Sequence, residues 1–258
     1  MGAIDQFVLR LRRGDGWFFS RARALYKGLM HSNLPLPAPV KAFYRLVYDA
    51  HFGIKFAVRW VYNYVYCEPA FRSRCVSVGK NLHLWLLPDV SGHTRIYIGD
   101  NVNLYGHLGV GSGRVFDDPT LVIGNGCDIG HNVFFTINKS VVIEDHVNIA
   151  SNVFILDSDA HPRDPYLRAQ KLPPSPDEVK PIRICKHAWI GHGSYIMKGV
   201  TVGEGAIVGS NSVVISDVPP FSVVMGNPAR VVVKDTRIRA ETPASPTPAE
   251  PVPTPASR

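Results

Sequence analysis

The sequence predicts a mainly β protein whose strands wind into a parallel β-helix, with helices before it and a disordered tail after it. Three observations lead to this prediction. Aliphatic residues recur every six positions through the middle of the chain, the first 75 residues are aromatic and basic without this repeat, and the last stretch is rich in proline. We therefore divide the chain into a helical segment (1–75), a β-helix (76–234) and a tail (235–258).

The first segment carries a helical pattern, since Phe52, Phe56 and Trp60 lie four apart and share one face. Up to position 40 the basic residues are Arg10, Arg12, Arg13, Arg21, Arg23 and Lys27, and the acidic ones are Asp5 and Asp15. The segment is either a cap packed on the first coil and on neighbouring subunits, or an interfacial helix, within residues 1–66, that lies on anionic lipid. We expect no signal peptide and no transmembrane helix, because charges interrupt every long apolar run.

The six-residue period matches neither a helix nor a half-buried strand. It fits one short strand plus one turn, with three such units making a triangular coil. The predicted inward residues are Ile98, Leu104, Val110, Ile123, Ile129, Phe135, Ile143, Ile149, Ile155, Ile184, Ile190, Ile196, Val202, Val208 and Val214. The residue four places after each is small or apolar and is expected beside a corner: Val102, Leu108, Cys127, Val133, Val147, Val153, Ala188, Ser194, Val200, Ala206, Ser212 and Val218.

Glycine and asparagine occupy the positions between these strands. Glycines follow many inward residues, at 99, 111, 124, 130, 191, 203 and 209, and are expected to serve tight turns. Asn101, Asn132, Asn152 and Asn211 stand where a left-handed conformation is expected, which asparagine tolerates.

The repeat stops at residues 155–165, which read ILDSDAHPRDP, and resumes at Ile184. His161 stands six residues after Ile155, where the next inward aliphatic residue is due. Pro162 and Pro165 discourage a continuing strand. We therefore expect a long loop over residues 157–183, opened by this histidine.

Composition limits the partners and the compartment. The formal net charge of +7 favours acidic partners, such as phosphate-bearing cofactors or anionic lipid, whereas the basic residues form no known nucleic-acid motif. The four cysteines form no CxxC pair and are expected as reduced thiols in the cytoplasm. Prolines at 243, 246, 248, 251, 253 and 255 predict a disordered tail.

Residues 187–233, HAWIGHGSYIMKGVTVGEGAIVGSNSVVISDVPPFSVVMGNPARVVV, resemble the C-terminal coils of the hexapeptide-repeat acyltransferases. This family includes maltose, galactoside and serine acetyltransferases and the sugar O-acetyltransferases of polysaccharide gene clusters. The most specific motifs are residues 189–191, 217–220 and 226–230, and the resemblance covers about residues 95–233. It implies a left-handed β-helix, a homotrimer with active sites in clefts between subunits, and acyl transfer from coenzyme A.

The resemblance also implies site residues. His161 matches the catalytic histidine of the family, and a neutral imidazole suits the removal of a proton from a sugar hydroxyl near neutral pH. Asp157 and Asp159 either fix the tautomer of that ring or bind backbone amides of the loop. Asn138, in TINKS, matches an asparagine that contacts the acceptor.

The family's coenzyme A contacts map onto five positions of this chain: Gly191, His192, Gly209, Ser210 and Arg230. Glycine and serine would allow the pantetheine arm to approach, and arginine would pair with a phosphate. His192 departs from the small residue that is usual there, and Lys234 is a further candidate.

Two other functions stay open. Zinc-type carbonic anhydrases with the same fold use a histidine pair spaced like His187 and His192. An open zinc site needs three protein ligands, and the slot of the third histidine holds Ser151 here, while His146 or His161 would need a different geometry. A non-catalytic β-helix scaffold is the other alternative, and it predicts no binding of coenzyme A.

The leading hypothesis is a homotrimeric O-acetyltransferase that uses acetyl-CoA and no metal. Its expected acceptor is a sugar hydroxyl in bacterial surface-polysaccharide or lipid-linked glycan synthesis, with serine, a small antibiotic or an amino group left open. The expected location is the cytoplasm, with a peripheral position on the inner membrane as the variant that the N-terminal segment suggests.

Overall fold

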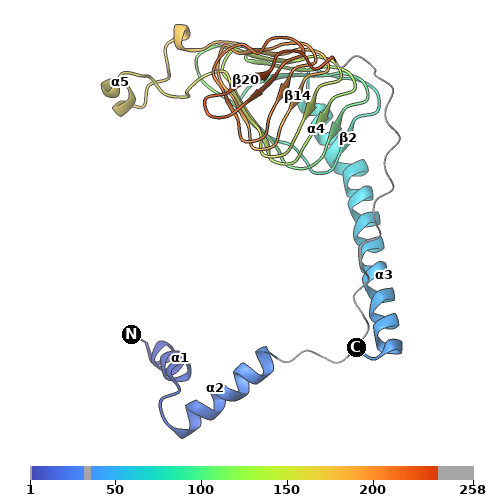
Figure 1. The fold of residues 1–258 in the computed structure, drawn as a ribbon, viewed down its shortest axis with the longest axis vertical. Coiled ribbons are helices and arrows are strands. Elements are labelled where there is room, and N and C mark those ends of the chain that lie inside the picture. Colours follow the sequence, from blue (N-terminus) through green and yellow to red (C-terminus); the bar gives the residue numbers. More distant parts are fainter. Residues whose placement is uncertain (1, 32–35, 238–258) are drawn as a thin grey trace. The chain divides into compact units, whose positions relative to one another are not determined.

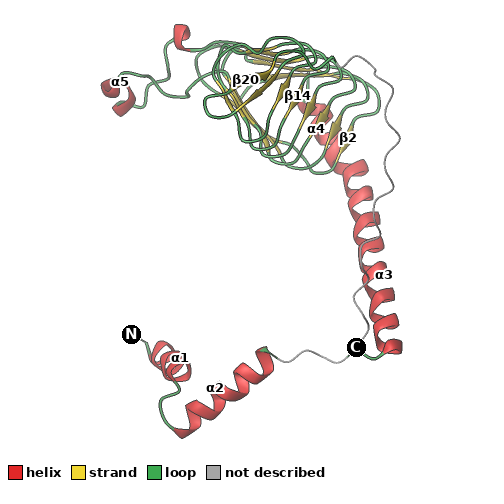
Figure 2. Cartoon of the chain, viewed as in Figure 1, coloured by secondary structure: helices red, strands yellow, loops and turns green. Residues whose placement is uncertain are grey.

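The computed structural model describes residues 2–31 and 36–237. Residues up to Ala57 form one unit and those from Val58 form a second. The second unit is a three-sided prism of short parallel strands stacked coil upon coil (Figures 1 and 2). The predicted tail falls mostly on residues 238–258, which lie outside the described residues.

Three sheets, named A, B and C here, form the sides of the prism, and each coil visits them in that order. Sheet A holds β1 (Ser77–Val78), β4 (Arg95–Ile98), β7 (Thr120–Ile123), β10 (Ser140–Ile143), β13 (Ile182–Ile184) and β16 (Thr201–Val202). Sheet B holds β2 (His83–Leu84), β5 (Asn103–Leu104), β8 (Asp128–Ile129), β11 (Asn148–Ile149), β14 (Trp189–Ile190), β17 (Ile207–Val208), β19 (Val223–Met225) and β20 (Arg230–Val233). Sheet C holds β3 (Asp89–Ser91), β6 (Leu108–Ser112), β9 (Val133–Ile137), β12 (Phe154–Leu156), β15 (Tyr195–Ile196) and β18 (Val213–Val214).

The core of the prism confirms the six-residue period. Every predicted inward residue is at most 4% exposed, and every predicted corner residue is at most 3% exposed. Identical residue types stack between coils, as where Ile143 pairs with Ile184 and Ile155 with Ile196. Burying one such side chain contributes roughly 1.5–3 kcal/mol, so the repeated aliphatic column is the main source of stability.

The corners confirm the role of asparagine and correct that of glycine. Asn101, Asn132 and Asn152 have φ of 56°, 54° and 60°, in the left-handed region. The glycines that follow inward residues have no positive φ. All of them except Gly111 are needed because the next coil lies too close for a side chain: a Cβ on Gly191 would lie 2.6 Å from the carbonyl oxygen of Val208.

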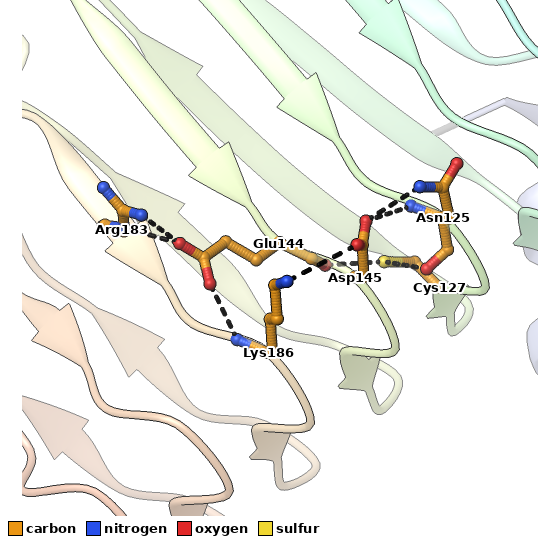
Figure 3. Close-up of polar contacts among 6 residues, drawn as sticks. All are labelled: Asn125, Cys127, Glu144, Asp145, Arg183 and Lys186. Atoms are coloured by element: carbon orange, nitrogen blue, oxygen red, sulfur yellow. Dashed lines mark hydrogen bonds and ion pairs between the residues drawn. The ribbon is translucent and has the colours of Figure 1, made fainter.

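Polar side chains at the corner between sheets A and B join successive coils (Figure 3). Asp145 accepts hydrogen bonds from the backbone and side-chain nitrogens of Asn125, at 2.8 and 3.1 Å. Glu144 accepts one from the backbone of Lys186 at 3.0 Å and forms an ion pair with Arg183. The corner amides of one coil are therefore satisfied by carboxylates of a neighbouring coil.

The N-terminal end of the prism is covered by the turn η1 (Asn63–Cys67) and helix α4 (Glu68–Arg74). Cys67 and Phe71 are buried in the same core as Leu84 of the first coil, and Asn63 donates a hydrogen bond to the Leu84 carbonyl at 2.9 Å. At the other end, β20 folds back antiparallel on β19. Residues 63–74 therefore form a cap on the first coil.

The helices before the prism are α1 (Ala3–Arg13), α2 (Trp17–Met30) and α3 (Ala38–Tyr62). None of them contains a buried residue. α1 and α2 contact each other through Phe7 and Phe19, whose rings lie 5.4 Å apart. Among the described residues, none of the helices has both the length and the hydropathy needed to cross a membrane.

Candidate active site at the loop

The prism is interrupted at the corner between sheets C and A, after β12. The interruption runs over residues 157–181, since β13 begins at Ile182, two residues earlier than the sequence predicts. The loop carries the short helix α5 (Pro165–Ala169) and the turn η2 (Pro176–Glu178). Figure 1 shows this segment, in yellow, projecting from the stack of coils.

Asp157 closes the base of the loop. Its carboxylate accepts hydrogen bonds from the backbone amides of Asn138 (2.8 and 3.0 Å), Lys139 (2.7 Å) and Ser140 (3.0 Å), at the turn of the preceding coil. Its own carbonyl accepts from Lys180 at 2.9 Å, where the loop returns. The side chain is fully buried, and this burial raises its pKa above the ordinary value, against the opposing effect of the amide hydrogen bonds.

His161 is exposed and does not fill the inward position that its spacing predicted. The reason lies four residues earlier, where the chain leaves the coil at Asp157, so the six-residue register no longer holds at position 161. Neither Asp157 nor Asp159 contacts the His161 ring: Asp157 binds the turn amides, and Asp159 forms an ion pair with Lys198 at 2.5 Å. The geometry therefore supports the backbone-binding interpretation of Asp157.

A buried polar network connects the turn at Asn138 with the segment before His161. The Asn138 amide donates a hydrogen bond to the Ser158 hydroxyl at 2.5 Å, and that hydroxyl also accepts from the backbone of Ala160 at 3.2 Å. Asn138 and Ser158 are each 2% exposed. Ala160 has a φ of 64°, which is unfavourable for a residue with a side chain, and such strain is most often found at functional sites.

Asn138 and Ala160 border a cavity of about 690 Å³, which brings together two of the predicted site residues, His161 and Asn138. One wall is formed by Gly111–Gly113 and Thr136 of sheet C and its corner, and the other by the loop. Gly113 is packed so closely against Asn138 that a Cβ there would lie 1.6 Å from the amide oxygen. The cavity can thus hold a small molecule beside an exposed imidazole and a fixed carboxamide.

Sequence reasoning missed the cations of this cavity, Arg114, Arg168 and Lys171. The only signal for them was their position in the two segments that break the repeat at the same corner, residues 113–119 and 157–181. Ser158 was missed too, although it stands in the quoted motif.

The predicted cofactor residues separate into two groups. Gly191, His192, Gly209 and Ser210 lie together on consecutive coils at the corner between sheets B and C, because a Cβ on Gly191 would lie 2.7 Å from the Ser210 nitrogen. Arg230 begins β20 and borders a different cavity of about 420 Å³ at the C-terminal end of the prism. The glycines at 191 and 209 are accounted for by the close packing of the next coil.

The histidines of the metal alternative do not converge. His187 stacks on His146 with the ring centroids 5.1 Å apart, while the His192 ring contacts the Asn152 amide at 3.3 Å on the next corner. Within the described ranges, no group of three histidine, cysteine, aspartate or glutamate side chains is arranged to hold a metal ion.

Models of known families match the two halves of the repeat. The bacterial transferase hexapeptide (six repeats) matches residues 181–216, and the hexapeptide repeat of succinyl-transferase matches residues 120–157. These are the coils on either side of the loop. Residues 120–157 and 181–216 therefore carry hexapeptide repeats. The prism is the left-handed parallel β-helix that the resemblance implied.

A solved structure supports the same fold. The chain is similar, with a TM-score of 0.51 and 22% identity, to a variant of AntD, an N-acyltransferase of Bacillus cereus solved in complex with dTDP and coenzyme A. The similarity covers 66% of this chain and 90% of that one. At this identity the similarity establishes the architecture.

Two curated relatives align with shorter parts of the chain. A Saccharomyces cerevisiae protein provisionally named an acetyltransferase is 37% identical over 116 residues, or 45% of this chain and 57% of its own length. A Staphylococcus aureus protein with the same provisional naming is 42% identical over 67 residues, or 26% of this chain and 34% of its own length. The chain thus spans less than two thirds of either relative.

Proposed function

We propose that this chain is a coenzyme-A-dependent O-acetyltransferase with His161 as the general base. The observation that carries the proposal is the cavity beside His161, at the point where a long loop interrupts a hexapeptide-repeat prism. The provisional naming of the relatives as acetyltransferases supports the reaction class. A scaffold without activity would not need an exposed histidine in a cavity of this size.

The reaction would use the chain's own groups as follows. Bound acetyl-CoA would supply the thioester carbon that is attacked. His161 would accept the proton of the acceptor hydroxyl as its oxygen forms the new bond, and would return that proton to the departing sulfur, so that protons balance over one turnover. The Asn138 carboxamide, held by Ser158, would orient the acceptor from the wall of the cavity.

The acceptor of this proposal is a sugar hydroxyl in bacterial surface-polysaccharide or lipid-linked glycan synthesis. A wall of glycine, serine and threonine at residues 111–113 and 136 suits a polyhydroxylated ring, because it leaves room and offers hydroxyl groups. An amino group as acceptor would use the same base and the same cavity.

The proposed assembly is a homotrimer whose active sites lie between subunits. His161 lies in the loop at the corner between sheets C and A. The residues proposed for the pantetheine arm, Gly191, His192, Gly209 and Ser210, lie at the corner between sheets B and C. The width of sheet C separates the two groups in one chain. A neighbouring copy would bring its corner between sheets B and C to the histidine. Arg230 would then bind a phosphate of coenzyme A further along the prism.

Replacing His161 tests the chemistry. His161→Ala is expected to lower kcat by ~10²–10⁴-fold, which is the usual contribution of a positioned base, and to leave the oligomer and its coenzyme A affinity unchanged. The measurement is thiol release from acetyl-CoA with a panel of sugars, together with sizing chromatography.

His187→Ala is the matched control, since this second exposed histidine stacks on His146 away from the cavity. It should keep full activity. Unchanged turnover in the His161 variant, or a loss confined to the His187 variant with stoichiometric zinc in the wild-type protein, would contradict the proposal and favour the hydratase.

We also propose that the N-terminal helices rest on an anionic membrane surface from the cytoplasmic side. α1 exposes Ile4 and Phe7 together with the basic residues of its last turn, and the aromatic side chains of α3 are about half or more exposed, for example Phe56 at 66% and Trp60 at 61%. Apolar side chains combined with basic ones favour an interfacial position. Deletion of residues 1–40 should abolish co-sedimentation with vesicles of anionic lipid, and equal sedimentation of both forms would refute it.

A further inference from the structure

The cavity beside His161 is lined by positive charge. Arg114, Arg168 and Lys171 border it, and no aspartate or glutamate does. Arg114 comes from the loop before β7, and the other two come from the loop after β12. Two segments far apart in the sequence therefore place their cations around one cavity.

Backbone contacts fix the two guanidinium groups. Arg168 donates from one terminal nitrogen to the carbonyls of Pro162 and Arg163, at 3.1 and 3.2 Å, and Arg114 donates to the carbonyl of Lys171 at 3.1 Å. Each guanidinium keeps further N–H groups that these bonds do not use. Since ordering a long side chain costs entropy, a guanidinium already held in place binds an anion at a smaller cost.

The acids of the loop of residues 157–181 do not neutralise these cations. Each is engaged elsewhere: Asp157 with the turn amides, Asp159 with Lys198, Asp164 with the amides of Tyr166 and Leu167, Asp177 with Ser175, and Glu178 with Arg163. Among the residues that the structure describes, no carboxylate pairs with Arg114, Arg168 or Lys171. The cavity therefore keeps a net positive charge.

We infer that the cavity binds the acceptor through an anionic group, a carboxylate or a phosphate on the sugar. This inference rests on the proposed function and adds the substrate class. Arginine matches both groups because its planar fork donates two parallel hydrogen bonds, and Lys171 adds a point charge. With the anion held by the loop, the sugar ring lies against the glycine-rich wall, and one of its hydroxyls is beside His161.

Matched acceptors test the charge directly. Methyl glucuronide, glucose 1-phosphate and methyl glucoside differ in the anionic group, and transfer from acetyl-CoA is measured for each. We expect a kcat/KM at least about tenfold higher for one of the two anionic sugars than for the neutral one, since a hydrogen bond to a charged group is stronger than one between neutral groups. The carboxylate and phosphate arms distinguish the two sources of negative charge. Equal use of all three sugars would overturn the inference.

Variants of the cations locate the effect. Arg168→Gln and Arg114→Gln should each raise the KM for the anionic sugar by about tenfold or more and leave its KM for acetyl-CoA within about twofold. Arg163→Gln is the matched control, because this loop arginine faces Glu178 and does not line the cavity. A rise in the KM for acetyl-CoA instead would show that these cations serve the cofactor, and the inference would fail.

Binding separates this inference from the proposed function. Calorimetry with methyl glucuronide and with glucose 1-phosphate measures the anion site without any turnover, and titration with coenzyme A measures the cofactor site. If the wild-type protein does not bind coenzyme A, the proposed function is contradicted. If it binds coenzyme A but neither anionic sugar, only the anion site is contradicted. Heat from the anionic sugars that disappears in Arg168→Gln and persists in Arg163→Gln supports it.

Discussion

At the scale of single residues, the segment before His161 is held by hydrogen bonds to a single atom, the hydroxyl oxygen of Ser158. Ala160 adopts a left-handed φ of 64°, which costs roughly 1–2 kcal/mol for a residue with a side chain. The Ser158 hydroxyl compensates by accepting from the Ala160 amide, and the same hydroxyl receives the Asn138 amide. The imidazole position thus depends on a three-residue chain of hydrogen bonds.

Gly113 allows this chain to form, and its replacement gives a sharp prediction. A Cβ at position 113 would lie 1.6 Å from the Asn138 amide oxygen, so Gly113→Ala must displace that side chain. We expect a loss of about 1–3 kcal/mol in the free energy of unfolding, as for other overpacked sites, together with a raised KM for the acceptor. Urea unfolding at one fixed protein concentration and acceptor titration measure the two effects.

Gly111→Ala, on β6 two residues earlier, is the control. Its Cβ would meet its nearest neighbour, the Ser91 hydroxyl, at an ordinary 3.5 Å, although Gly111 also lines the cavity. Equal losses in the two alanine variants would mean that any side chain in this wall is harmful, and that Asn138 has no special part.

At the scale of elements, the loop of residues 157–181 is joined to the prism on both of its sides. Asp157 binds the amides of the coil before the loop, and Asp159 binds Lys198 of the coil after it. The backbone bond from Lys180 to Asp157 closes the base. A long loop that is fixed at its base and carries its own short helix can position side chains precisely at its start.

Asp157 is expected to stabilise the loop rather than to take part in proton transfer. Asp157→Ala leaves one buried and two part-buried amides without an acceptor and should cost about 2–4 kcal/mol of unfolding free energy. Asp157→Asn keeps one oxygen and should cost less, about 1–2 kcal/mol. An Asp157→Asn variant that unfolds like the wild type yet loses kcat as fully as His161→Ala would instead identify an aspartate that acts on the imidazole.

The raised pKa of Asp157 also predicts how the free energy of unfolding changes with pH. Because burial raises the pKa of Asp157 in the folded chain above 3.8, its protonated form contributes stability that is complete below that value and is lost as pH rises through the folded pKa. Asp157→Asn lacks this ionisation. The stability deficit of the variant, measured by urea unfolding, should therefore shrink between pH 4 and pH 7, and a deficit that grows would reverse the assigned direction.

The elements also show what the sequence could predict. Each strand and corner of the prism repeats a local pattern, so Ile149 or Asn152 could be placed from its own neighbours in sequence. The loop has no such period. The prediction that His161 points inward failed because it assumed that the coil continues to position 161, whereas the chain leaves the coil at Asp157. The contact of Arg114 with Lys171 joins two irregular segments, and no pattern in either of them predicts that they meet.

At the scale of the whole molecule, the prism separates the parts of the proposed site. His161 and the cavity lie at the corner between sheets C and A, whereas Gly191 and Ser210 lie at the corner between sheets B and C. If a site is completed by a neighbouring copy, it combines the histidine of one subunit with the cofactor corner of the next. Two variants that are each inactive would then complement each other in mixed oligomers.

We expect this complementation between His161→Ala and Ser210→Trp. Ser210 is exposed at its corner, so a tryptophan there should obstruct the cofactor without unfolding the coil. In trimers assembled at random from equal amounts, one site in four receives an intact histidine from one subunit and an intact corner from its neighbour, so activity should return to about a quarter of the wild-type value. Co-refolding of the two variants, with each refolded alone as the control, measures it. If the mixture stays as inactive as its components, each chain holds a complete site, and the proposed arrangement between subunits is wrong.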